Sequence, residues 1–112
     1  MTLELPLINF LCKKSFTVIK KAIKNITEIN GAKQAHIDDA ISVIEFLAWL
    51  DKSWVYGADE MSAQDMLFHL RAKNVNLRGE SFHTISGFAE NSAVIHYRAS
   101  FDTNKPIDNT SL

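Results

Sequence analysis

The central part of the chain carries apolar residues at the spacing of a long helix. Between Ile26 and Ser53 they recur at steps of three and four residues, which places them along one face. Asn25 can cap the first amides of this helix, and Glu28 can bond back to the Asn25 amide. Gly31 costs the helix roughly 1 kcal/mol relative to alanine, which indicates close packing or a break in the first turns. We expect a helix over about 26–53 whose buried face consists of Ile37, Ala40, Ile41, Ile44, Leu47 and Ala48.

A second, shorter helix is predicted after a loop over residues 55–60 that holds Gly57. Ser62, followed by Asp65, has the pattern of an N-cap, and the helical pattern continues to about Lys73. Its apolar side is supplied by Met66, Leu67 and Leu70.

Two runs rich in β-forming residues follow, Phe82–Phe88 and Ala93–Tyr97. Ala89–Ser92 lies between them and has turn chemistry, so the pattern predicts a β-hairpin. A hairpin alone is marginally stable and leaves an unpaired edge, so we expect more sheet or a covering helix to complete it. The predicted fold class is therefore α+β: two helices followed by a β-hairpin, as the front half of something larger.

Composition indicates a globular chain without a nucleic-acid surface. The 112 residues suffice for one domain or a part of one, and 46% are apolar while 22% are charged. A net charge of −1 supplies no basic field for phosphates, so no nucleic-acid partner is expected.

The N-terminal stretch fits neither a signal peptide nor a membrane anchor. Met1–Leu11 is apolar but carries Glu4 and Pro6 and lacks a basic start, and no apolar run reaches the roughly 18 residues of a membrane span. Cys12 is the single cysteine and cannot form an internal disulfide, which favours a reducing compartment. We expect a soluble, cytoplasmic protein with no membrane partner.

The histidines and carboxylates form no metal-ligand signature. His36, His69, His83 and His96 are 33, 14 and 13 residues apart, whereas zinc sites have close His or Cys pairs. The chain by itself is therefore expected to bind no metal and no other cofactor. A contact between His36 and Asp39, on one helix face, is expected to be structural. Three further carboxylates surround the start of the second helix and are expected to act as caps: Asp59, Glu60 and Asp65.

His96 has two interpretations that the residues alone leave open. It lies in an apolar strand-like run, where a lone histidine is more often a core residue satisfied by one hydrogen bond. It also follows a turn that would carry it to the rim of a sheet, where a neutral imidazole could donate to a substrate carbonyl or transfer a proton.

Several consecutive motifs together resemble a known enzyme family. The strand-like region contains Phe82-x-Thr84-Ile85-Ser86 and Asn91-x-Ala93-Val94-Ile95-His96-Tyr97. Upstream stand Lys21–Asn25 with Glu28-Ile29, then Ala35-His36-x-x-Asp39-Ala40, Phe46-Leu47-x-Trp49-Leu50, Ser62-Ala63-x-Asp65 and Leu70-Arg71. Taken in order, these resemble the Xaa-Pro aminopeptidase (aminopeptidase P) branch of the pita-bread metallopeptidases.

The resemblance implies a fold, a reaction and one site residue. Residues 21–112 would form the N-terminal part of a pita-bread catalytic domain, and residues 1–20 would be an unmatched lead-in. The family uses two divalent metals, usually manganese, to remove an N-terminal residue that precedes proline, so its substrate is a peptide with proline second. His96 matches the residue that binds substrate or moves a proton. The metal ligands would lie past Leu112, so the chain alone is expected to be inactive.

Some positions depart from the family pattern, and a different class of function stays open. His83 replaces a small polar residue, and Ala89-Glu90 lacks the usual turn glycine. The alternative is a non-enzymatic interaction module, in which the apolar helix face binds a complementary fragment or a second copy of the chain.

Overall fold

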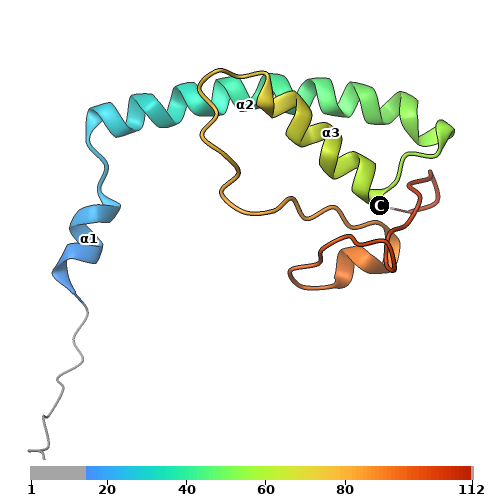
Figure 1. The fold of residues 1–112 in the computed structure, drawn as a ribbon. Coiled ribbons are helices and arrows are strands. Elements are labelled where there is room, and N and C mark those ends of the chain that lie inside the picture. The colour runs from blue at the N-terminus through green and yellow to red at the C-terminus, as the bar shows by residue number, and fades with distance from the viewer. Residues whose placement is uncertain (1–14, 112) are drawn as a thin grey trace, which may run out of the picture. The chain divides into compact units, whose positions relative to one another are not determined.

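The computed structural model describes residues 15–111. Cys12 therefore lies outside the described residues, as does most of the expected lead-in. The chain divides into two compact units, Met1–Ala32 and Lys33–Leu112. Along the chain the elements are α1 (Phe16–Ala22), α2 (Ile26–Ser53), the 3₁₀ helix η1 (Trp54–Tyr56), α3 (Glu60–Ala72) and the 3₁₀ helix η2 (Ala89–Ala93) (Figure 1).

The long helix begins and ends where the sequence predicts. Asn25 Oδ1 accepts the Glu28 amide at 2.9 Å and Glu28 Oε2 accepts the Asn25 amide at 2.9 Å, which confirms the reciprocal cap. Gly31 neither breaks the helix nor packs closely, since a Cβ there would meet nothing within 4 Å. α1, which the sequence did not predict, begins at an N-cap in which Ser15 Oγ accepts the Thr17 amide at 3.3 Å.

The apolar face of α2 is exposed, contrary to the prediction that it is buried. Ile37, Ile41, Ile44 and Leu47 are 55–66% exposed. Within the second unit, α3 runs back along the neighbouring face of α2 instead (Figure 1). That face holds the buried Ser42 and the half-buried Val43, Phe46, Trp49 and Leu50. A single partner helix covers only one face of α2. The periodicity identifies an apolar stripe, but it does not show whether another element covers that stripe.

The second helix starts earlier than expected. α3 begins at Glu60, and its N-cap is Asp59 rather than Ser62. Asp59 Oδ1 accepts the Ser62 amide at 2.7 Å, and Ser62 Oγ accepts the Asp59 amide at 2.8 Å. Ser62 is therefore the reciprocal member of the capping box. The Asp59 cap confirms part of the prediction that carboxylates around this helix start are caps.

The predicted β-hairpin is absent from residues 15–111, where the structure is helical with no strand. Phe82–Phe88 has no regular secondary structure and no ladder partner, and Ala89–Ala93 is the helix η2 rather than a tight turn. His96, inside the predicted second strand, has a φ of 55°, which interrupts the extended backbone that a strand needs. An isolated antiparallel bridge joins Asp59 to Pro106. β-forming residues favour strands only where a neighbouring strand accepts their hydrogen bonds, and none is present here.

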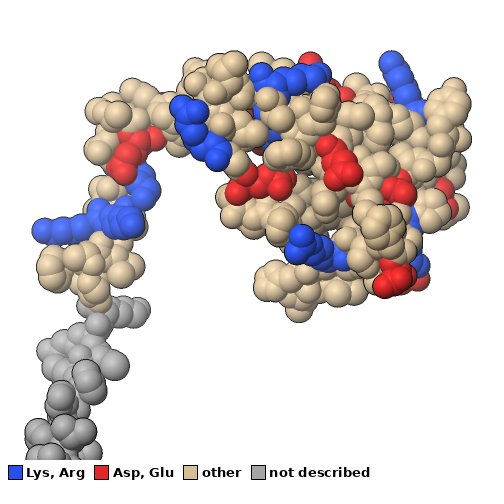
Figure 2. Space-filling model, viewed as in Figure 1, with Lys and Arg blue, Asp and Glu red and all other residues tan. Residues whose placement is uncertain are grey.

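The described surface mixes both signs of charge. On the face shown in Figure 2, basic and acidic side chains are interspersed and form no continuous basic area. Among residues 15–111, no helix combines the length and apolar character needed to cross a membrane.

Candidate functional site

The first residue of α3 has the most deeply buried side chain of this region. Glu60 is 0% exposed. Because the N-cap is Asp59, three residues before the predicted Ser62, Glu60 is the first residue of the helix. Its side chain extends toward the C-terminal segment rather than toward its own helix amides. The prediction that Glu60 is a cap is therefore wrong, and its partners lie 28 to 45 residues away.

Four donor groups converge on the Glu60 carboxylate. The Phe88 amide donates at 2.7 Å and the Lys105 amide at 3.1 Å. The Tyr97 hydroxyl donates to Oε2 at 2.6 Å, and Asn91 Nδ2 lies 3.0 and 3.1 Å from the two oxygens. An ionised carboxylate only accepts hydrogen bonds, so it can satisfy all these donors at once.

The ionisation of this carboxylate follows from its contacts. Burial by itself would raise the pKa of Glu60, but hydrogen bonds from Tyr97, Phe88, Asn91 and Lys105 together outweigh it and lower the pKa below 4.5. The same contact acts oppositely on its partner: burial and the adjacent Glu60 carboxylate raise the pKa of the Tyr97 hydroxyl. At neutral pH the pair is a carboxylate that accepts from a neutral phenol.

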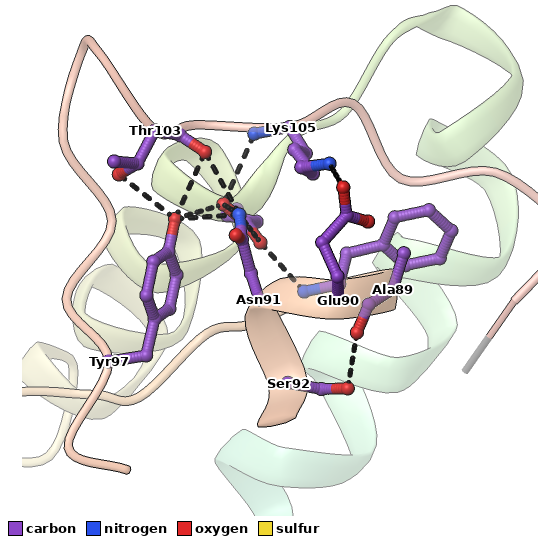
Figure 3. A network of polar contacts seen from close by, with 9 residues as sticks. Ala89, Glu90, Asn91, Ser92, Tyr97, Thr103 and Lys105 are labelled. Carbon is purple, nitrogen blue, oxygen red and sulfur yellow. Dashed lines mark hydrogen bonds and ion pairs between the residues drawn. The ribbon is translucent and has the colours of Figure 1, made fainter. Parts of the chain in front are cut away.

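Thr103 extends this cluster through its contacts with Tyr97 and Asn91. Tyr97 Oη lies 3.1 Å from Thr103 Oγ1, and Asn91 Nδ2 donates to the Thr103 carbonyl at 2.9 Å. In Figure 3 the side chains of Asn91 and Tyr97 point toward Thr103, whereas the side chain of Lys105 is turned toward Glu90. The rings of Tyr97 and Phe88 are buried beside it, at 7% and 8% exposure.

The C-terminal segment is also tied to the start of α3 through its backbone. The Glu60 amide donates to the Lys105 carbonyl at 3.1 Å, and the Ile107 amide donates to the Ala58 carbonyl at 2.8 Å. Asn104 Nδ2 donates to Asp59 Oδ2 at 2.7 Å, and its Oδ1 accepts the Met61 amide at 3.1 Å. A surface ion pair joins Lys105 to Glu90. These contacts take the place that a sheet ladder would otherwise fill for these backbone groups.

His96 lies on an exposed turn held by this cluster. The Tyr97 amide donates to the Val94 carbonyl at 3.1 Å, which closes a turn with Ile95 and His96 at its centre. Both central residues are exposed, and His96 adopts a φ of 55°. His96 is thus neither a buried strand residue nor a core residue satisfied by one hydrogen bond; it is presented to solvent between two anchored residues, Asn91 and Tyr97.

The other singled-out residues lie elsewhere. Asp39 pairs with Arg71, whose Nε and Nη2 donate to its two oxygens at 2.6 and 2.9 Å. This bond to Arg71 lowers the pKa of Asp39, to which His36 adds only a small electrostatic effect. His69 and His83 are exposed. In the part of the chain that the structure describes, no three His, Cys, Asp or Glu side chains come together as metal ligands would.

The sequence does not reveal the Glu60 cluster. In it, Asn91 and Tyr97 stand out only as parts of a motif, and Glu60 only as a charge at a helix start. No local pattern connects positions this far apart. The available signal was weak: polar residues flanking His96 in an otherwise apolar stretch.

No model of a protein family matches the chain. Curated proteins do match. The chain is 46% identical over 81 residues to a probable Xaa-Pro aminopeptidase P of Chaetomium globosum, which covers 70% of this chain and 13% of that protein. It is 39% identical over 104 residues to Xaa-Pro aminopeptidase 1 of Dictyostelium discoideum, covering 88% of this chain and 17% of that protein. A probable Xaa-Pro aminopeptidase P of Pyricularia oryzae is 42% identical over 95 residues.

The relatives are peptidases by name, and the matched stretch includes most of this chain. The chain belongs to the Xaa-Pro aminopeptidase P family. It spans 12% to 17% of the length of these curated relatives.

Proposed function

We propose that this chain forms part of the catalytic domain of an aminopeptidase that removes the N-terminal residue of peptides with proline second. Residues 21–112 would be the N-terminal part of that domain, with residues 1–20 outside it. The observation that carries the proposal is the exposed, anchored His96 in a chain 46% identical to a probable Xaa-Pro aminopeptidase P. The lone Cys12 supports a cytoplasmic location.

The proposed role of His96 is to contact the substrate. An exposed imidazole at neutral pH can donate a hydrogen bond to the scissile carbonyl or transfer a proton during bond cleavage. Such a group typically contributes about 10²- to 10⁴-fold to a rate. The positive φ at His96 fits this role, because unusual backbone angles persist where surrounding contacts enforce them and are frequent at functional sites.

The metals implied by the family resemblance do not fit the described residues. Residues 15–111 bring together no cluster of His, Cys, Asp or Glu that could hold even one ion. The two divalent metals, with manganese the expected ion, are therefore proposed to be held by ligands outside this part of the chain. What these residues contribute is the substrate-facing imidazole and the frame that holds it.

The pita-bread architecture is part of the same proposal. In it, α2 and α3 are the first helices of the domain, and Phe82–Phe88 becomes a strand once neighbouring strands accept its hydrogen bonds. The exposed stripe of α2 is where the rest of such a domain would pack. Its members are 55–66% exposed although their spacing is that of a buried helix face.

A chimeric enzyme tests the function directly. Residues 21–112 replace the matching stretch of the Chaetomium globosum relative, and hydrolysis of an Xaa-Pro peptide is measured with added Mn²⁺. We expect activity within about tenfold of the unaltered relative, and a loss of about 10²- to 10⁴-fold on His96→Ala. His83→Ala, at another exposed histidine, is the matched control and should change the rate little. A folded but inactive chimera, or an unchanged rate in the His96→Ala variant, contradicts the proposal.

A second candidate function rests on the exposed helix face. If the chain acts as a non-enzymatic interaction module, the stripe of α2 would bind a complementary fragment or a second copy of the chain, since exposed apolar surface of this kind favours association. Sedimentation velocity of the purified chain, with and without the unmatched part of the Chaetomium globosum relative, separates the cases. A strictly monomeric chain that binds no fragment contradicts the interaction role.

A further inference from the structure

We infer that Glu60 is a positioning residue for His96: its buried carboxylate fastens both sides of the turn and sets how the imidazole is presented. The inference rests on the proposed function of His96. From its place at a helix start, Glu60 would be expected to act only as a cap.

The contacts of Glu60 bracket the turn. Asn91 lies before His96 and Tyr97 directly after it, and both side chains bond the same carboxylate. The backbone amides of Phe88 and Lys105, farther out on each side, donate to it as well. One side chain therefore holds the loop at four points that enclose His96.

Side-chain contacts and turns, rather than a sheet, hold this loop in shape. Within residues 88–105 the structure has one 3₁₀ helix and no strand, so no sheet ladder fixes the backbone of the turn. His96 is itself exposed, and its φ of 55° is one that L residues other than glycine rarely adopt. Tyr97 is buried, and through it the carboxylate fixes the residue next to His96. If Tyr97 is released, His96 is free to relax to a common φ.

The site requires a carboxylate rather than an amide. Oε1 accepts the Phe88 amide and Oε2 accepts the Lys105 amide, so both oxygens face a backbone N–H. In Glu60→Gln the side-chain NH₂ replaces one oxygen and points a donor at one of these amides, whichever way it is turned. The shape is kept while the hydrogen bonding is broken, which makes this variant a sharp probe.

The structural arm of the test uses the full 112-residue chain and needs no activity. Solution NMR of the wild type should show for His96 the short separation between its amide and α hydrogens that a positive φ imposes. In Glu60→Gln this signature and the shifts of residues 94–97 should change, whereas signals of the Asp39–Arg71 pair should not. Asp65→Asn, at an exposed carboxylate of the same helix, should leave His96 unaltered. If Glu60→Gln unfolds the chain, Tyr97→Phe is the milder variant, because it removes only the hydrogen bonds of the Tyr97 hydroxyl.

The functional arm uses the chimera. Glu60→Gln should lower kcat about 10- to 100-fold, as expected for a displaced catalytic group, with a smaller change in KM. Adding it to His96→Ala should cause little further loss, because both changes remove the same contribution.

The two arms separate the possible failures. Unchanged His96 signals in both Glu60→Gln and Tyr97→Phe overturn this inference and leave the proposed function standing. Additive losses in the double variant also overturn it, since Glu60 would then act independently of His96. If His96→Ala leaves the rate of the chimera unchanged, the proposed function and this inference are overturned together, even if Glu60→Gln changes the NMR signals of His96.

Discussion

The Tyr97 hydroxyl donates to Glu60 Oε2 at 2.6 Å across 37 residues of sequence. This bond joins the start of α3 to the residue that follows His96. It connects a helix that folds from local signals to a loop that has no regular ladder of its own, and it affects the ionisation of both partners.

The stability of the chain should depend on pH through this pair. The folded-state pKa of Glu60 is lowered, so its stabilising effect is complete above its ordinary value of 4.5 and is lost as the pH falls through the folded value. The pKa of Tyr97 is raised, so its contribution is present below its ordinary value of 10.0 and is lost as the pH rises above it. Urea unfolding from acid to alkaline pH measures both limbs.

Substitution of Glu60 isolates the part of the pH dependence that lies at acid pH. Glu60→Gln should destabilise the chain by about 1–3 kcal/mol at pH 7, the cost of a buried donor left without an acceptor. The difference from wild type should shrink as the pH falls below 4.5, because wild-type Glu60 is then protonated as well. A difference that stays constant down to strongly acid pH contradicts the lowered pKa.

Gly87 should resist even the smallest side chain. A Cβ at this position would lie 3.0 Å from the Asn91 carbonyl oxygen and 3.1 Å from Ser92 Cα, both of them backbone atoms of η2. Gly87→Ala should destabilise the chain by about 1–3 kcal/mol, measured by urea unfolding, since the backbone of η2 must move.

Gly31→Ala, in contrast to Gly87→Ala, should stabilise the chain. A Cβ at Gly31 meets nothing within 4 Å inside an unbroken helix, so the change should add about 0.5–1 kcal/mol to the stability of α2. Circular dichroism at 222 nm should show increased helicity. Loss of helicity would mean that Gly31 has a packing role after all.

The Asp39–Arg71 pair should contribute modestly and with salt dependence. Its side chains are 43% and 28% exposed, so solvent screens the interaction despite the two-point geometry. Asp39→Asn should cost about 0.5–1 kcal/mol at low salt and less at 1 M NaCl. Asp51→Asn, at another exposed carboxylate of α2, is the control and should change stability little. An Asp39→Asn effect that is independent of salt contradicts an electrostatic origin.

The exposed stripe of α2 should control association of the chain. Ile41→Glu together with Ile44→Glu should remove any self-association and any binding to the remainder of the Chaetomium globosum relative, as measured by sedimentation velocity. The charges would have to be desolvated on burial. Gln34→Glu, an exposed polar position of the same helix, should have no such effect. Equal behaviour of the two variants would mean that another surface mediates association.

Local signals in the sequence determined what depends on nearby residues. The bounds of α2 and its Asn25–Glu28 cap follow from spacing and from side chains three residues apart, and both are confirmed. The resemblance on the residues around His96 pointed to the family to which the chain belongs. These predictions succeed because a helix cap and a motif each depend on a few consecutive residues.

The tertiary structure decided what depends on distant residues. It showed which face of α2 is covered, since periodicity marks an apolar stripe but not its partner. It also replaced the predicted hairpin with a loop held by Glu60, because strands require partners, whereas here a buried carboxylate accepts the amides of Phe88 and Lys105. The turn that carries His96 lies between donors that converge from positions 88 to 105 on one side chain at position 60, a relationship that no local pattern in the sequence encodes.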